Sequence, residues 1–254
     1  MKKSTIGTIL GVVAIIGFII AASVVVINGN NRIINYNKYD LNNIVATTFD
    51  NGNIGEHVKG NEDAAAVIIE YADFQCPGCA GMNININKAV EKSNGKLAVA
   101  YRSFIMAYHQ NGNAAASAAE AAGLQGYWKE YGDKLFSEQA EWGYAEEPKL
   151  TEYFEKYFNE VTDNQGDIDR FRKDITSDNV KKKIEFDMGA AKRVQVVSTP
   201  SLYIDGQLIE WAFKDESTTS ASISVDGEVI TWDHSLTNQE LIDLLLDIAD
   251  KKSK

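Results

Sequence analysis

The two cysteines of this 254-residue chain stand in one motif, Cys76-Pro77-Gly78-Cys79, and the sequence around it strongly limits the local fold. Residues 64–72 form an apolar run that is typical of a strand covered on both faces. Behind the motif, apolar residues recur at helical spacing as far as a Ser-Asn-Gly stop at residues 93–95. The motif is therefore predicted to begin a helix that directly follows a buried strand.

This position predicts a reactive thiol. Cys76 would occupy the N-cap, and Pro77 the first helical position, where a missing N–H group costs nothing. The free N–H groups of Gly78 and Cys79, together with the positive end of the helix dipole, would then face the Cys76 sulfur and favour its thiolate. A more stable thiolate makes a more oxidising disulfide, so the pattern indicates thiol-disulfide chemistry.

Two other uses of a cysteine pair are less consistent with the sequence. A zinc site needs about four ligands, but His57, His109 and His234 are scattered without metal-ligand spacing. A purely structural disulfide across two intervening residues closes too small a loop to stabilise much. We therefore predict a redox-active pair, with neither a metal nor a cofactor.

The remaining sequence predicts an α/β domain interrupted by helices. A second strand over 97–105 completes a strand-helix-strand crossover and hence a parallel strand pair. Helical periodicity over 113–194 predicts a bundle of about four or five helices. Asp-Gly dipeptides at 205–206 and 226–227 predict two hairpins, and the capping box at 237–240 begins the last helix.

The amino-terminal region predicts a membrane anchor. Residues 6–27 carry no charge, follow Lys2 and Lys3, and would reach roughly 33 Å as a helix, enough for a hydrocarbon core of about 30 Å. Cleavage as a signal peptide is the alternative, with residues 21–23 as the only small-residue candidates. The length favours a retained anchor, and the lysines then place residues 1–5 in the cytoplasm and the rest outside it.

Charge and composition complete the predicted organisation. The formal net charge of −11 argues against nucleic-acid binding and against attraction to an anionic membrane surface. Residues 28–55 are rich in Asn and Gly and are predicted to be a linker. We therefore expect a cytoplasmic tail at 1–5, an anchor at 6–27, this linker, and one folded domain over 56–254.

Three segments carry a resemblance to a known family. They are HVKGN at 57–61, EYADFQCPGC at 70–79 and STPSLYIDG at 198–206. Together they resemble the DsbA-like thiol-disulfide oxidoreductases of bacterial envelopes, and most of all the membrane-anchored BdbD-like members. The resemblance implies an α/β thioredoxin-like fold with an inserted helical domain at about 106–195, here preceded by one N-terminal transmembrane helix.

The resemblance also implies roles for particular residues. Cys76 would be the exposed nucleophile, and Cys79 the buried thiol that resolves the mixed disulfide. Glu70 matches a buried acid that exchanges a proton with Cys79, although a surface Glu on an edge strand is the alternative. Thr199 and Pro200 match a cis-proline loop that pairs with an extended substrate, where an ordinary turn proline is the alternative.

Some residues depart from the family pattern or carry no assigned chemistry. The dipeptide Pro77-Gly78 lacks the histidine of the strongest oxidases, and Thr199 also precedes the proline in isomerase and reductase relatives. An additional hairpin within 213–232 either extends the substrate-facing rim or lengthens the sheet. His109 is expected in a loop or at a helix entry and Trp128 in the core.

The predicted function is an anchored oxidase that donates disulfides to reduced, unfolded extracytoplasmic proteins through Cys76 and Cys79. From the family, turnover requires a membrane redox partner of the DsbB or vitamin K epoxide reductase (VKOR) type. A disulfide reductase or isomerase of the envelope is the alternative within the same chemistry. A non-catalytic anchored binding or chaperone module is the alternative from a different class.

Overall fold

A five-stranded mixed sheet organises the part of the chain that the computed structural model describes, residues 34–212 and 220–254. Its order is β1-β3-β2-β4-β5, with bounds β1 His57–Gly60, β2 Ala66–Ala72, β3 Leu97–Ser103, β4 Ser201–Ile204 and β5 Gln207–Leu208. β2 and β3 are parallel, and the other neighbours are antiparallel. Helix α2 (Pro77–Lys92) connects the parallel pair, which confirms the predicted crossover.

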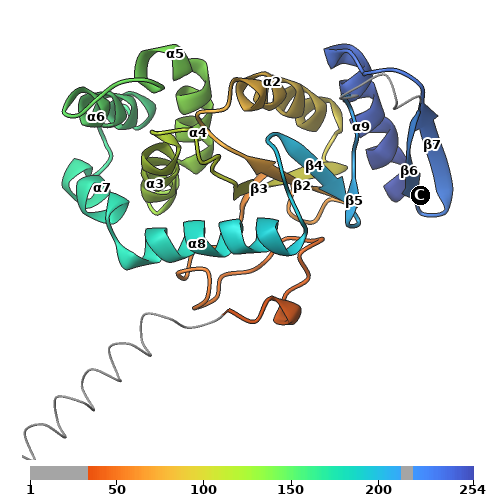
Figure 1. Cartoon of the computed structure of the whole chain (residues 1–254), viewed down its shortest axis with the longest axis horizontal. Coiled ribbons are helices and arrows are strands. Elements are labelled where there is room, and N and C mark those ends of the chain that lie inside the picture. The colour runs from red at the N-terminus through yellow and green to blue at the C-terminus, as the bar shows by residue number, and fades with distance from the viewer. Residues whose placement is uncertain (1–33, 213–219) are drawn as a thin grey trace, which may run out of the picture. The chain divides into compact units, whose positions relative to one another are not determined.

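Helices cover both faces of this sheet (Figure 1). Helix α2 and the last helix, α9 (Asn238–Lys252), share one apolar cluster with Ile68 of β2 and Val99 of β3. The opposite face packs through Tyr71 and Ala100 against α8 (Asp178–Arg193). β2 is therefore covered on both sides, which explains why its sequence, with Glu70 as its one polar residue, is an apolar run instead of an alternating one.

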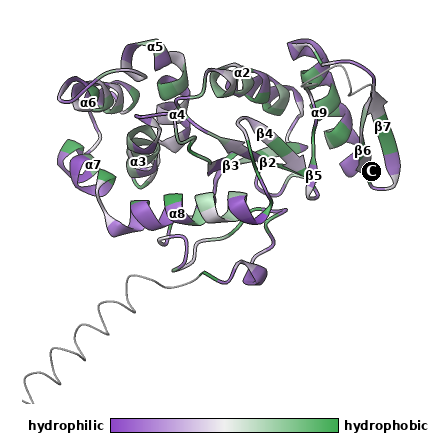
Figure 2. Ribbon diagram, viewed as in Figure 1, coloured by the Kyte–Doolittle hydropathy of each residue, from purple (hydrophilic) through white to green (hydrophobic). Residues whose placement is uncertain are grey.

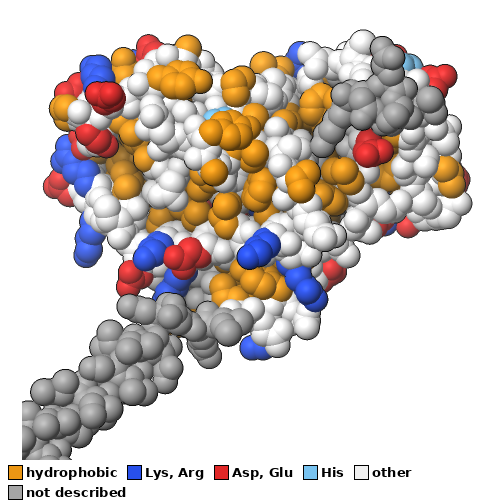
Figure 3. All heavy atoms as spheres, viewed as in Figure 1, with side chains coloured by type: hydrophobic (Ala, Val, Ile, Leu, Met, Phe, Trp, Pro, Cys, Tyr) orange, Lys and Arg blue, Asp and Glu red, His pale blue; other side chains and the backbone are white. Residues whose placement is uncertain are grey.

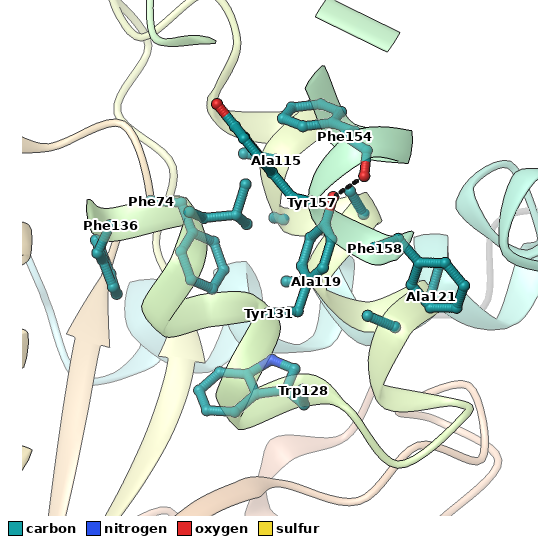
Figure 4. Packing of buried hydrophobic residues seen from close by; sticks show 14 of the residues in the cluster. Phe74, Ala115, Ala119, Ala121, Trp128, Tyr131, Phe136, Phe154, Tyr157 and Phe158 are labelled. Carbon is teal, nitrogen blue, oxygen red and sulfur yellow. Dashed lines mark hydrogen bonds between the residues drawn. The ribbon is translucent and has the colours of Figure 1, made fainter. Parts of the chain in front are cut away.

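The remaining helices lie between β3 and α8 and form the predicted insertion. They are α3 Gly112–Gly123, α4 Trp128–Ser137, α5 Gln139–Trp142, α6 Lys149–Val161 and α7 Ile168–Ile175. Most of these helices have one hydrophobic face and one hydrophilic face (Figure 2). Buried aromatic rings fill the space between them, and the Tyr131 hydroxyl donates a 3.0 Å hydrogen bond to the Phe154 carbonyl (Figure 4).

One aromatic side chain connects the insertion with the cysteine motif. Phe74 lies between β2 and α2, and its ring centroid is 4.9 Å from that of Phe136 in α4 and 5.0 Å from that of Tyr101 in β3. Gly132 of α4 leaves room for this ring, because a Cβ atom there would lie 3.3 Å from it. The helical insertion thus holds the turn that carries the cysteines.

The additional hairpin forms a sheet of its own. β6 (Ala221–Val225) and β7 (Glu228–Trp232) pair only with each other within the described residues, beside α9 (Figure 1). Asp226 and Gly227 have positive φ angles, as the predicted two-residue turn requires. The hairpin therefore does not lengthen the main sheet; residues 213–219 lie outside the described part of the chain.

The amino-terminal side is described from residue 34 onward. The predicted tail at 1–5 and anchor at 6–27 lie outside the described residues, and among residues 34–212 and 220–254 no helix has both the length and the apolar character to span a bilayer. Residues from 36 onward belong to the folded unit, beginning with a short 3₁₀ helix, η1 (Tyr36–Lys38). The Tyr36 hydroxyl donates a 3.0 Å hydrogen bond to the Phe186 carbonyl in α8.

Candidate active site

Cys76 and Cys79 occupy the first turn of α2. Cys76 is the N-cap, with extended backbone angles (φ −78°, ψ 120°), and Pro77 takes the first helical position, as the sequence predicts. Both cysteines are free thiols. Cys76 keeps 9% of its surface exposed while Cys79 is fully buried, so the predicted difference in access is present, although Cys76 is much less open than the word exposed implies.

The site favours a negative charge on Cys76. Hydrogen bonding from the Cys79 thiol is the largest influence, and together with the N–H groups of Cys79 and Gly78 it outweighs burial and lowers the pKa of Cys76 to about 5. The Cys76 side chain makes no capping hydrogen bond to the helix N-terminus. The N–H groups at this end of α2 therefore act on its sulfur through their dipoles, which stabilise the thiolate, the reactive species.

The loop before β4 faces this thiol. The Thr199–Pro200 peptide bond is cis, and the Cys76 thiol donates a 3.5 Å hydrogen bond to the Thr199 carbonyl. A Cβ atom on Gly78 would lie 3.2 Å from Cδ of Pro200 and 3.7 Å from the Cys76 sulfur. Glycine at position 78 therefore permits the close approach of the proline ring to the cysteine turn.

Glu70 is buried beneath the pair, in the middle of the sheet. Only 3% of its surface is exposed, and this burial raises the pKa of its carboxyl to about 7, against a smaller opposing effect of Lys59. Burial also raises the pKa of Cys79 well above its ordinary value; the hydrogen bond to Cys76 and the proximity of Glu70 act in the same direction. Both shifts favour the protonated, neutral form of these two buried groups.

Lys59 connects this buried acid with the insertion. Its ammonium group lies 2.8 Å from Oδ1 of Asp133 in α4 and 3.1 Å from Oδ1 of Asn87 in α2, and it also bonds Asn83. Partial burial would raise the pKa of Asp133, but Lys59 and the two Asn side chains outweigh it and hold that pKa at about 2. The sequence analysis missed this cluster, although Lys59 lies within the HVKGN segment that carries the resemblance.

Asp73 and His109 form a second contact that the sequence analysis missed. The Asp73 amide lies 3.5 Å from the Cys79 sulfur, and Oδ2 of Asp73 lies 2.7 Å from Nδ1 of His109. His109 does lie in a loop at the entry of α3, as predicted, yet it reaches the cysteine motif. One feature of the sequence could have indicated this contact. Asp73 directly follows the buried strand β2 and lies three residues before Cys76.

Exposed apolar side chains lie on the loops that contact the cysteine turn. The Gln75 side chain donates a hydrogen bond to the Gly143 carbonyl and accepts one from the Asn111 backbone N–H. It thereby joins the cysteine turn to the loop that carries Tyr144. Tyr144, Tyr108 and Val197, which lies two residues before Thr199, are each more than 70% exposed. On the face shown in Figure 3, hydrophobic side chains run across the middle, while charged ones gather along α8 and the helical end.

Comparison with known proteins agrees with this geometry. A family model described as thioredoxin matches residues 52–224. A probable disulfide bond formation protein D of Bacillus anthracis is 26% identical over 215 residues, which cover 82% of this chain and 92% of that protein. The chain belongs to the thioredoxin family. The oxidised BdbD of Bacillus subtilis has a similar fold, with a TM-score of 0.54 at 14% identity over 82% of this chain and all of that one.

Other relatives of this thioredoxin-family chain are much longer proteins. A Na⁺/H⁺ antiporter, NhaA 3 of Salinispora tropica, is 28% identical over 169 residues, which are 66% of this chain. The chain spans only about a quarter of the length of that antiporter (24%). The predicted site residues nevertheless converge on one place: Cys76, Pro77, Gly78 and Cys79 at the start of α2, Thr199 and Pro200 across from them, and Glu70 close to Cys79.

Proposed function

We propose that this chain is a thiol-disulfide oxidase that donates disulfides to reduced extracytoplasmic proteins through Cys76 and Cys79. The observation that carries the proposal is the opposite environment of the two sulfurs. One lies at a helix N-terminus with its pKa lowered to about 5, and the other is fully buried with its pKa raised. Such a pair favours reduction of its own disulfide, because reduction places the charge where the protein stabilises it.

The proposed reaction proceeds through a mixed disulfide. A substrate thiolate attacks the Cys76 sulfur of the Cys76–Cys79 disulfide, and Cys79 leaves as a thiolate that takes up a proton. The second substrate thiolate then attacks the substrate sulfur of the mixed disulfide, and Cys76 leaves as a thiolate. The substrate loses two electrons and two protons to form its disulfide, and the enzyme pair becomes a dithiol.

The neighbouring residues have proposed roles in these steps. Glu70, with a pKa of about 7, is suited to give a proton to Cys79 or to take one from it near neutral pH. The main chain at Thr199 and the cis-proline Pro200 would hold an extended substrate segment beside Cys76. The apolar side chains around the site suit the exposed hydrophobic segments of an unfolded protein.

The proposed setting follows the sequence and the named relatives. Residues 6–27 would anchor the chain in the cell membrane, with the domain over 56–254 outside the cytoplasm. The name disulfide bond formation protein D, borne by relatives from two Bacillus species, supports the oxidase direction. We propose a membrane redox partner of the DsbB or VKOR type that returns the dithiol to the disulfide.

The reduction potential of the full chain tests the direction of the reaction. A Cys76 pKa of about 5 lies between the values for thioredoxin, about 7, and for a strong oxidase, about 3.5. Two pKa units below thioredoxin correspond to about 60 mV, so glutathione titration is expected to give roughly −210 mV. A potential near −270 mV, or disulfide transfer that persists in the variant Cys76→Ser, would contradict the oxidase proposal.

One observation favours a reductase or isomerase as the second candidate. Gly78 provides no side chain near Cys76, and the close Pro200 ring leaves little room for one, so a side-chain donor cannot stabilise the thiolate further. Oxidation of a reduced two-cysteine peptide by the disulfide form separates the candidates. An oxidase completes this transfer without added glutathione, whereas a reductase leaves the peptide reduced.

A further inference from the structure

Asp73 links the buried Cys79 to the protein surface. Its backbone N–H lies 3.5 Å from the Cys79 sulfur, and its side chain is fully buried. Oδ1 of the carboxylate accepts a 2.9 Å hydrogen bond from the backbone N–H of Gln75. Oδ2 accepts two hydrogen bonds, one from the backbone N–H of Met106 at 2.9 Å and one from Nδ1 of His109 at 2.7 Å. Three donors from two segments therefore determine where this residue lies.

The start of α3 closes around the same carboxylate. A Cβ atom on Gly112 would lie 2.8 Å from Oδ1 of Asp73, so only a glycine there allows this close approach. His109 is the one side chain among the three donors, and 11% of its own side chain is exposed. It borders an open cavity of about 430 Å³ along α8. Among the groups that hold Asp73, His109 is thus the one that a substitution can remove without altering the backbone.

We propose that His109 is a positioning residue for Cys79, acting through Asp73. By holding the Asp73 carboxylate, it keeps the Asp73 N–H directed at the Cys79 sulfur, where the N–H stabilises a thiolate. This inference rests on the proposed redox chemistry of the pair and assigns to it a residue outside the cysteine motif and the cis-proline loop.

The hydrogen bond from the Asp73 N–H to the Cys79 sulfur matters in each step in which Cys79 is a thiolate. In the oxidase direction Cys79 is the leaving thiolate when a substrate thiolate attacks Cys76, and a thiolate of lower pKa leaves faster. In the reverse direction, the Cys79 thiolate attacks the Cys76 sulfur of a mixed disulfide and expels the other thiolate. The Asp73 N–H donor therefore assists both directions through Cys79, and no hydrogen bond joins it to the Cys76 sulfur.

Oxidised glutathione separates these steps in the full chain. The Cys76 thiolate of the reduced protein attacks glutathione disulfide, releases one glutathione thiolate and forms a mixed disulfide. The Cys79 thiolate then attacks Cys76, expels the second glutathione thiolate and closes the Cys76–Cys79 disulfide. Acid quenching and mass spectrometry give the lifetime of the mixed disulfide, while Cys79→Ser stops the reaction after the first step.

His109→Ala is expected to lengthen this lifetime roughly three- to tenfold, the range for loss of one ordinary hydrogen bond. The first step, measured in the Cys79→Ser background, is expected to stay within about twofold. His109→Asn, whose side-chain amide is a donor, is expected to restore most of the rate. His234→Ala, which removes a histidine with a 57% exposed side chain, is the matched control and is expected to have no effect.

Three results would overturn the proposal: an unchanged lifetime in His109→Ala, equal slowing of the first step in the Cys79→Ser background, or no rescue by His109→Asn. If the alanine variant does not fold, His109→Leu gives the same comparison, because it fills the space without a donor. The assay does not depend on the oxidase proposal. A wild-type chain that fails to oxidise peptides but shows the His109 effect would refute that proposal and leave this inference standing.

Discussion

Two thiols in the same turn of α2 show how local surroundings change one chemical group. Cys76 lies at the N-cap, where hydrogen bonds and helix N–H groups favour the thiolate, and Cys79 is the third residue of the helix and is fully buried, where water is excluded. Their pKa values shift in opposite directions for this reason. A pair of identical residues thereby acquires a reactive member and a protected one.

Alkylation tests this difference directly. At pH 6, above the lowered pKa of Cys76 of about 5, iodoacetamide is expected to modify Cys76 of the reduced chain rapidly and to leave Cys79 unmodified. Mass spectrometry after trypsin digestion identifies the labelled cysteine, and Cys76→Ser is the control. Slow labelling of Cys76 at pH 6 would instead support the non-catalytic binding module, whose cysteines need no activated thiolate.

Glu70 predicts a pH-dependent contribution to stability. Its pKa is about 7 when folded and about 4.5 when exposed, so the native state binds the proton more tightly between these values. The free energy of unfolding is then expected to fall as pH rises through this window, by up to about 3 kcal/mol from this one group. Glu70→Gln removes the titrating group and should be more stable than wild type at pH 8.

Urea unfolding of the two reduced proteins at pH 4 and pH 8 measures this contribution. The difference between variant and wild type is expected to grow with pH, since at pH 4 both side chains are neutral. A difference that does not vary with pH would show that Glu70 titrates normally and is not the buried acid of the pair.

At the scale of elements, buried charges attach α8 to the sheet. Lys183 and Asp187, one helical turn apart, are both fully buried and lie 2.6 Å apart. Oδ2 of Asp187 accepts a 3.1 Å hydrogen bond from the Ser103 amide at the end of β3. Burial raises the pKa of Asp187 to about 6, with Lys183 opposing the shift and Glu120 adding to it. This contact aligns the last helix before the cis-proline loop.

Lys183→Met is expected to destabilise the protein by about 3–5 kcal/mol, because it leaves Asp187 buried without its cation. The loss should be larger at pH 8 than at pH 5, where Asp187 can take up a proton. Lys181→Met, on the exposed side of the same helix, is the control and should change stability by less than about 0.5 kcal/mol. Similar effects of the two substitutions in urea unfolding would refute this role.

At the scale of the molecule, the segment before β1 belongs to the folded unit. The guanidinium group of Arg102, which is fully buried in β3, donates hydrogen bonds to the Leu41 carbonyl at 2.6 Å and to the Asn43 carbonyl at 2.8 Å. Tyr36 of η1 packs against α8, where its ring contacts that of Phe186 and its hydroxyl donates a hydrogen bond to the Phe186 carbonyl. Residues 36–55 therefore cover the face of the sheet opposite α2 in addition to connecting the domain to what precedes it.

Removal of this segment is expected to cost stability. A fragment over 56–254 leaves the buried Arg102 cation without two acceptors and should be less stable than a fragment over 36–254 by about 3–6 kcal/mol, at about 1.5–3 kcal/mol for each hydrogen bond to a charged group. Urea unfolding of the two fragments under one set of conditions measures the difference. Equal stabilities would show that residues 36–55 are only a linker.

The sequence alone determined the features that depend on neighbouring residues. The cysteine turn at the start of α2, the Asp-Gly turns and the capping box of α9 are all readable, because each results from contacts within about four residues. The thioredoxin-like order of elements and the helical insertion followed from periodicity together with the family resemblance.

Only the tertiary structure decided which distant side chains meet at the cysteines. His109 is 36 residues from Asp73, and Lys59 is 74 residues from Asp133. Pro200 approaches Gly78 from the far end of the insertion. Hydrogen bonds depend on distance in space, which periodicity along the chain does not report, so the Asp73–His109 and Lys59–Asp133 contacts required the fold.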